Sequence, residues 1–145
     1  MNELIKWISI ADRFNKMYLN KKFEPLGINS SQQVYILRIC EHEGITQDKL
    51  QPLIHINKSN ITRALAQLES AGFIRREPNK KDKRTIRLYP TEKARNIYQE
   101  IINIEDEWIA LITKDFSFQD TEALVSLIKK VGESAIDSLH GDEDE

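Results

Sequence analysis

The chain has 145 residues, of which 40% are hydrophobic and 30% are charged, and its formal net charge is −2. This length predicts one domain with a single core. The chain contains neither an apolar run of the roughly 18 residues that a membrane span needs nor a secretory signal pattern, so we expect neither a membrane protein nor a secreted one. The single cysteine cannot form an internal disulfide and is typical of a reducing cytoplasm, where we expect the protein to act.

Helical spacing predicts a long amphipathic helix over residues 3–20, which Pro25 separates from the next element. Ser30 with Gln33 three residues later is a capping-box signature, and it predicts the start of a second helix that reaches about Glu41. This second helix is apolar nearly all round. We therefore expect it to lie at the centre of the fold.

A short third helix is predicted after Thr46, which is a favourable N-cap residue. Pro52 follows within this helix. A proline there removes one helical hydrogen bond and clashes with the preceding turn, so the helix is expected to be kinked or shortened at that point.

A fourth helix is predicted from about Lys58 to Ala71, and Gly72 is expected to supply the left-handed cap that reverses the chain. One face of this helix is apolar at three-and-four spacing, with Ile61, Ala64, Leu65, Leu68 and Ala71. The opposite face is polar and carries Asn57, Lys58, Ser59, Asn60, Thr62, Arg63 and Gln67. The helix is therefore expected to bury one side and to present amides, hydroxyls and one arginine on the other.

Two short apolar runs, residues 73–76 and 85–89, predict a β-hairpin whose basic loop spans residues 78–84. Thr91 is expected to cap a fifth helix of about twenty residues, roughly 30 Å long. Ser117 with Asp120 is expected to open the last helix. The sequence thus predicts six helices and one hairpin.

The predicted first, fifth and last helices have broader apolar faces than a small central module can cover. We therefore expect two copies to associate through residues 1–24 and 91–140, with an intramolecular helical cap as the alternative. Residues 141–145 are interpreted as an acidic tail.

Charge is distributed unevenly along the chain. Residues 49–87 contain ten basic and three acidic residues, a net charge of +7, and the remainder carries −9. A helix bearing amides and an arginine suits base edges in the DNA major groove, and a cationic loop suits phosphates or a narrow minor groove. The sequence therefore predicts a mainly α fold with a small β-hairpin: a winged helix-turn-helix over residues 30–90, flanked by the dimerisation helices. A solvated charged face and a winged helix that binds protein are the alternatives.

Two segments resemble the MarR family of bacterial transcription regulators. The first is residues 56–63 (Ile-Asn-Lys-Ser-Asn-Ile-Thr-Arg) with residues 68–74 (Leu-Glu-Ser-Ala-Gly-Phe-Ile). The second is Asp82-Lys83-Arg84 leading to Leu88 and Thr91, which resembles the Asp-x-Arg wing signature, although Tyr89 and Pro90 separate Leu88 from Thr91 here. With matching helix order, the resemblance covers about residues 3–139.

Dimerisation would place two reading helices about 34 Å apart, which suits an inverted repeat in double-stranded DNA. The resemblance implies a homodimer that binds operator DNA, usually as a repressor released by a small ligand or chemical signal. It implies that Arg84 enters the minor groove and that Asp82 orients it. The side chains of Asn60 and Arg63 also have the chemistry to bridge adenine and guanine. The candidate DNA-binding residues are Thr46, Gln47, Asn57, Lys58, Ser59, Asn60, Thr62, Arg63, Gln67, Lys80, Lys81, Asp82, Lys83 and Arg84. Pro52 leaves the contribution of Thr46 and Gln47 open.

The resemblance also implies a cleft for a small aromatic or phenolic effector between the dimerisation helices and the DNA-binding lobe. Its candidate lining residues are Phe14, Tyr18, Tyr35, Arg38 and Trp108. Arg38 stands out as a cation on an apolar helix that could meet a carboxylate ligand. Ordinary core packing of the aromatic residues, and an ion pair of Arg38 with Glu41 or Asp12, are the alternatives.

Other chemistries have little support in the sequence. Cys40 is interpreted as a core residue, and His42, His55 and His140 show no metal-ligand spacing, so we expect neither a metal nor a cofactor. The chain lacks a phosphate-binding glycine loop, a nucleophile elbow and a zinc-protease motif. An isolated Ser-x-x-Lys at residues 126–129 is interpreted as a chance match, and we do not expect an enzyme.

Overall fold

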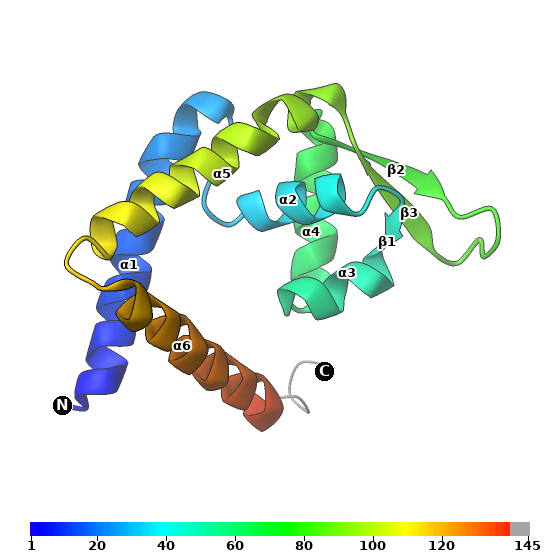
Figure 1. The fold of residues 1–145 in the computed structure, drawn as a ribbon. Coiled ribbons are helices and arrows are strands. Elements are labelled where there is room, and N and C mark those ends of the chain that lie inside the picture. Colours follow the sequence, from blue (N-terminus) through cyan, green and yellow to red (C-terminus); the bar gives the residue numbers. More distant parts are fainter. Residues whose placement is uncertain (140–145) are drawn as a thin grey trace.

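The structure is a computed structural model that describes residues 1–139, so the acidic tail and His140 lie outside the described residues. Within them it contains six α-helices, a 3-10 helix and three short strands (Figure 1). The elements are α1 Glu3–Phe23, η1 Glu24–Leu26, α2 Gln33–Glu41, β1 Ile45–Thr46, α3 Gln47–Ile54, α4 Lys58–Ser70, β2 Ile74–Pro78, β3 Ile86–Pro90, α5 Glu92–Ile112 and α6 Phe118–Leu139. The predicted fold class, mainly α with a small sheet in a winged helix-turn-helix, is confirmed.

The core is formed by α2, α4, the sheet and the first half of α5, together with the end of α1. Tyr35, Ile36 and Ile39 of α2 are all buried, which confirms the predicted central position of this helix. Around α2 lie α3, α5 and β3. The buried apolar residues are Leu19, Phe23, Ile28, Tyr35, Ile36, Ile39, Leu50, Ile61, Leu65, Leu68, Phe73, Ile74, Leu88, Ala94, Ile101 and Ile104.

The start of α2 differs from the prediction. Asn29 and Gln32, not Ser30 and Gln33, form the reciprocal pair. The Gln32 N–H donates to Asn29 Oδ1 (3.1 Å), and the Asn29 N–H donates to Gln32 Oε1 (2.9 Å). The Ser30 N–H instead donates to Asn20 Oδ1 of α1 at 2.7 Å. A contact with another helix thus decided between two overlapping capping patterns, and α2 begins at Gln33.

The third helix passes through its proline. Pro52 lies inside α3, which continues to Ile54 and ends with His55 in the left-handed region at φ 53°. The predicted shortening at Pro52 is therefore not observed, and the alternative, a kink at that point, stays a prediction. Thr46 stands at the N-cap position as expected, but its side chain makes no capping hydrogen bond.

The sheet has three antiparallel strands in the order β1-β3-β2, one more than predicted. β1 is two residues long, and Ile45 pairs with Leu88 of β3. A strand this short is below the length at which apolar alternation is detectable, which explains why the sequence pattern did not reveal it. The pairing places the residues that lead into α3 directly beside the hairpin.

Three predicted helix boundaries are confirmed. Gly72 adopts φ +84°, and Phe73 N donates to Leu68 O in the hydrogen bond expected for a left-handed cap. Ala71, which was expected on the buried face, is exposed because it lies at this helix end. The Thr91 side chain accepts from the backbone of α5, and Ser117 and Asp120 bond reciprocally at the start of α6.

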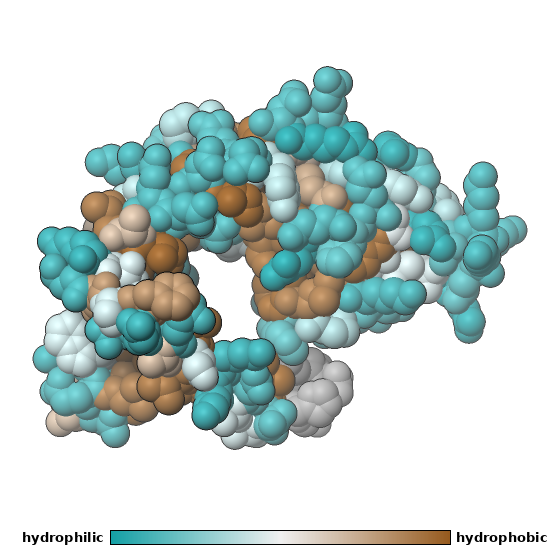
Figure 2. All heavy atoms as spheres, in the orientation of Figure 1, coloured by the Kyte–Doolittle hydropathy of each residue, from teal (hydrophilic) through white to brown (hydrophobic). Residues whose placement is uncertain are grey.

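The three long helices form an arm beside the winged-helix lobe, and α6 points away from α5 (Figure 1). None of the described residues of α6 is buried. Brown, apolar side chains are exposed around this arm (Figure 2). The exposed large apolar residues of α1, α5, α6 and the connecting turn are Leu4, Ile5, Trp7, Ile8, Phe14, Met17, Ile109, Leu111, Ile112, Phe116, Phe118, Leu124, Val125, Leu127, Ile128, Val131 and Leu139. Among residues 1–139, no helix combines the length and the apolarity that a membrane crossing requires.

Candidate nucleic-acid interface

The polar face of α4 is exposed along its whole length. All seven residues predicted on that face, from Asn57 to Gln67, are exposed, while Ile61, Leu65 and Leu68 on the opposite side are fully buried. Asn57 is the N-cap of the helix, and its Oδ1 accepts from Asn60 N at 2.8 Å. The apolar stripe therefore fixes the helix rotation, and the amides and hydroxyls face solvent.

Several of these side chains are held by one another. Arg63 donates to Asn60 Oδ1, so the two residues present their donors as one unit on a single helical turn. Ser59 Oγ donates to Asn57 Oδ1 at 3.0 Å. Such local bonds restrict the rotamers of long side chains before any ligand is bound, and they reduce the entropy lost on binding.

Gln47 ties the two helices of the helix-turn-helix together. Its Nε2 at the start of α3 donates to Thr62 Oγ1 of α4 at 2.9 Å, and Thr62 in turn donates to the Lys58 carbonyl. Thr46 stands one residue before Gln47 at the edge of the sheet. These two candidate residues therefore lie beside the exposed face of α4, as the helix-turn-helix prediction required.

The β2–β3 loop, which we call the wing (residues 79–85), carries the predicted cations. Lys80, Lys81, Lys83 and Arg84 are all exposed, and the Arg84 side chain is 91% accessible. Asp82 Oδ1 accepts from the Arg84 backbone N–H at 3.1 Å and from Nε at 3.2 Å. These two hydrogen bonds hold Asp82 beside Arg84. They also orient the guanidinium group, which stays exposed to solvent.

Two other cations of the basic residues 49–87 are engaged within the fold. Arg76 of β2 pairs with Glu69 of α4 at 2.8 Å, and its guanidinium group lowers the pKa of that carboxyl through a hydrogen bond and charge attraction. Arg75 pairs with Glu77 and lies 4.8 Å over the Tyr89 ring. These two arginines link β2 to its neighbours, whereas the wing cations extend into solvent.

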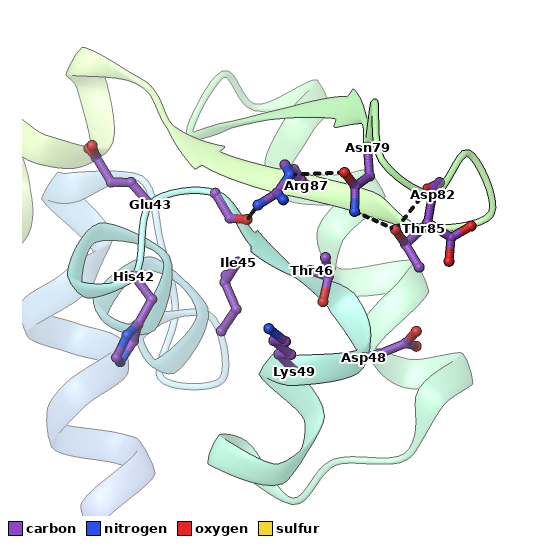
Figure 3. Close-up of a pocket in the computed structure, with 11 residues that line it drawn as sticks. His42, Glu43, Ile45, Thr46, Asp48, Lys49, Asn79, Asp82, Thr85 and Arg87 are labelled. Carbon is purple, nitrogen blue, oxygen red and sulfur yellow. Dashed lines mark hydrogen bonds between the residues drawn. The ribbon is translucent and has the colours of Figure 1, made fainter.

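Sequence reasoning missed two residues at the base of the wing. Asn79 is buried and bonds to Thr85 and Arg87, and Arg87 also bonds to the Gly44 carbonyl at 2.9 Å (Figure 3). They border an open cavity of about 600 Å³ between the wing, the α2–β1 turn and the start of α3. A polar residue where the hairpin loop begins was the available signal. Its partners, however, could not be read from the sequence.

The candidate effector residues do not converge on one cavity. Arg38 lines a space of about 440 Å³ between α2 and α5, with Ile102 and Glu105 on its far side. Phe14 and Trp108 line a different one of about 420 Å³ between α1 and α5. Tyr35 is buried in the core, where burial raises the pKa of its hydroxyl, and Tyr18 stacks on Trp108 with ring centroids 4.3 Å apart.

Arg38 makes the ion pair that was considered as its alternative role, with Glu41 at 3.1 Å. Its Nε and the Oε1 of Gln33 are nevertheless buried with no hydrogen-bond partner, and both residues line the α2–α5 cavity. Across that cavity, burial raises the pKa of Glu105, and the nearby Asp106 raises it further. This cavity therefore combines a cation with polar atoms whose hydrogen bonds are not all made.

Cys40 is half-buried against the core, as predicted. Burial is the main cause that raises the pKa of its thiol to about 11, so the thiol is protonated at neutral pH. Among the described residues, no group of three or more histidine, cysteine or acidic side chains is arranged to hold a metal ion.

The geometry matches known regulators along most of the chain. A model of the MarR family matches residues 28–86, which include α4 and the whole wing. A MarR-family transcriptional regulator of Listeria monocytogenes, solved in complex with 26mer DNA, is 32% identical to this chain. The match covers 95% of this chain and 92% of that one, with a TM-score of 0.86. The chain belongs to the MarR family of transcriptional regulators.

Other relatives agree with this assignment. The HTH-type transcriptional regulator YybA of Bacillus subtilis is 28% identical over 131 residues, which cover 90% of this chain and 87% of that protein. A mutant MarR from E. coli, solved in complex with operator DNA, is 26% identical with a TM-score of 0.81, covering 88% of this chain and 92% of that one. This chain therefore shares the fold of its MarR-family relatives over most of its length.

Proposed function

We propose that this MarR-family protein binds double-stranded DNA with sequence preference through α4 and the wing. The observation that carries the proposal is the exposed polar face of α4 beside four exposed wing cations, Lys80, Lys81, Lys83 and Arg84. An α-helix fits the major groove, and a short cationic loop reaches the flanking backbone or minor groove. Two relatives that share this fold were solved in complex with DNA, which supports DNA as the ligand.

We assign different tasks to the candidate residues. The Asn60–Arg63 pair suits base edges, since an amide bridges adenine and a guanidinium group bridges guanine. Arg84, directed by Asp82, suits a narrow minor groove. The remaining candidates fit phosphate or peripheral contacts that fix the register. They are Thr46, Gln47, Asn57, Lys58, Ser59, Thr62, Gln67, Lys80, Lys81 and Lys83.

We also propose that the protein acts as a homodimer. The arm leaves apolar side chains such as Phe118 (75% exposed) and Leu127 (60% exposed) uncovered. Many exposed apolar side chains gathered on one arm mark an interface, and a two-fold pair would bury the same surface of both copies. The two α4 helices would then address half-sites about 34 Å apart, which is one turn of an inverted repeat.

The proposed sign of regulation is repression, because a dimer seated on an inverted repeat blocks that duplex to other proteins. We propose a small aromatic acid as the ligand that releases the protein from DNA. Its carboxylate would meet the buried Nε of Arg38, which has no hydrogen-bond partner in the α2–α5 cavity. Such a ligand joins α2 of the DNA-binding lobe to α5 of the arm, so it could bias their relative position. Phe14 and Trp108 line a separate apolar cavity, and Tyr18 and Tyr35 remain packing residues by this assignment.

Selection of bound duplexes from a random pool, followed by titration at 50 and 200 mM salt, tests the proposed function. We expect one enriched inverted-repeat motif. We also expect an affinity that falls by orders of magnitude over this salt range, because each neutralised phosphate releases counterions. A winged helix that docks on protein would enrich no motif, and any weak binding to DNA would be independent of sequence. That result would refute the proposal.

A further inference from the structure

We propose that Asn79 and Arg87 are positioning residues: they hold the wing in one arrangement and so determine where Arg84 meets DNA, without touching DNA themselves. The inference deepens the proposed function and rests on it. The charge pattern of the wing does not reveal the role of either residue. Asn79 is neutral, and Arg87 directs its hydrogen bonds inward.

Asn79 anchors the base of the wing. It is 8% exposed, and among the described residues it is the one buried side chain that is polar or charged. Its Nδ2 donates to Thr85 Oγ1 at 3.0 Å, and its Oδ1 accepts from Lys81 N at 3.1 Å and from Arg87 Nε at 3.2 Å. Its backbone N–H donates to the Thr85 carbonyl at 3.1 Å. Asn79, which follows β2, is therefore bonded to residues at the other end of the wing and in β3.

Thr85 passes this constraint to the tip of the wing. Its backbone N–H and its Oγ1 both donate to the Asp82 carbonyl, at 3.1 and 3.0 Å. Asp82 Oδ1 then holds Arg84 by two hydrogen bonds. A continuous series of contacts therefore runs from the buried Asn79 to the exposed guanidinium group. Each bond is within ordinary hydrogen-bond length.

Arg87 ties the wing to the helix-turn-helix. From β3, its NH1 donates to the Gly44 carbonyl at 2.9 Å, and the Gly44 N–H donates to the Leu88 carbonyl at 2.8 Å. The α2–β1 turn that contains Gly44 leads directly through Thr46 into α3. Figure 3 shows Arg87 between Asn79 and this turn, along the wall of the cavity. The wing is thereby fixed relative to the helices that bind the duplex.

The consequence for binding is preorganisation. A loop with the same cations but without these bonds would sample several arrangements. Its affinity would fall by the fraction of time that it spends in the competent one. The side chain of Arg84 is almost fully exposed, so its folded position depends on the backbone that Asp82 and Thr85 hold. Loss of Asn79 should therefore act on DNA through Arg84.

A double-mutant cycle on the full chain tests this dependence, with the selected duplex as the probe. We expect N79A to weaken binding about five- to twentyfold in the wild-type background and less than twofold in the R84A background. N79A changes no charge, yet it should lower the salt slope by about one, as R84A does. Arg87→Met, which removes both donors but keeps an apolar stem, should show the same dependence. Asn103→Ala, at an exposed amide of α5 outside the wing, is the matched control.

A measurement without DNA separates failure of this inference from failure of the proposed function. We expect trypsin to cleave N79A and Arg87→Met within the wing, after Lys80, Lys81, Lys83 or Arg84, at least fivefold faster than wild type, while the thermal midpoint measures any global destabilisation. If N79A weakens binding equally in both backgrounds, or leaves wing cleavage and affinity unchanged, the positioning role is refuted. If the wild type binds no duplex, the DNA-binding proposal fails, and an unchanged rate of wing cleavage would still refute the ordering role of Asn79.

Discussion

Substitution of Arg84 by alanine tests the part of the interface that the structure isolates best. The Arg84 side chain is 91% exposed, and its side-chain hydrogen bond is to Asp82 of the same loop. A surface ion pair of this kind contributes at most about 1 kcal/mol to folding. We therefore expect the thermal midpoint of R84A to stay within a few degrees of wild type, so that any large change in DNA affinity reports on the contact itself.

The expected loss of affinity is about 1–3 kcal/mol, or roughly five- to 150-fold at 25 °C. Arg84→Lys serves as the matched control, since it keeps the charge but loses the planar group that bonds to Asp82. If Arg84 acts only as a point charge, the lysine variant should bind as wild type does. If it is inserted in a fixed geometry, the variant should fall between wild type and R84A.

Fluorescence anisotropy with a labelled duplex, at several salt concentrations, measures both effects. We expect the slope of log affinity against log salt to decrease by about one in R84A, because one cation no longer displaces counterions. An unchanged affinity and slope in R84A, with the fold intact, would show that the wing does not reach DNA in the proposed manner.

Three further predictions concern the arm, a turn and the thiol. Leu127→Glu places a charge on the exposed apolar face of α6, where burial in an interface would be costly. Sedimentation should therefore show monomers at concentrations where the wild type is dimeric. A dimer that persists would place the interface elsewhere. Gly72→Ala should lower the free energy of unfolding, measured by chemical denaturation, by about 1–2 kcal/mol. The reason is backbone strain at φ +84°, since a Cβ there would have space, with the nearest atom, on Lys93, 3.9 Å away. No loss of stability would show that the turn adapts. Cys40, with a thiol pKa of about 11, should be alkylated at pH 8 roughly a hundredfold more slowly in the folded than in the denatured protein, and more rapidly as pH rises; equal rates would contradict its burial.

The helices were predictable from sequence because their determinants are local. Apolar spacing along α4 fixed its buried face, and Thr91 and Gly72 marked boundaries that the structure confirms. The pattern around α2 contained two overlapping capping pairs. The choice between them depended on Asn20 of α1, which bonds to the Ser30 N–H. Local patterns thus located the helix but not its first residue.

The exposed polar and charged residues of the site were predictable from the sequence. The residues that hold the wing in place were not. The exposed amides of α4 were predicted from helical spacing, and the wing cations were predicted from local charge. Neither prediction requires knowledge of a tertiary contact. The role of Arg87 depends on a carbonyl 43 residues away, and that of Asn79 on a loop closure that no periodicity encodes. The predicted effector residues do not share one cavity, again because tertiary contacts decide their positions. Tyr18 stacks on Trp108, and Arg38 lines a different cavity.

Charge and geometry therefore make separate contributions to this interface. A hairpin with the same four wing cations but without Asn79 would keep its net charge and its long-range attraction to a polyanion, which act mainly on the association rate. It would lose the single arrangement that holds Arg84 against Asp82, and that loss should appear in the dissociation rate and in the preference for one duplex over another. Because a buried amide is costly unless it is bonded, its presence at the base of an exposed loop is itself an argument that the loop geometry is specified.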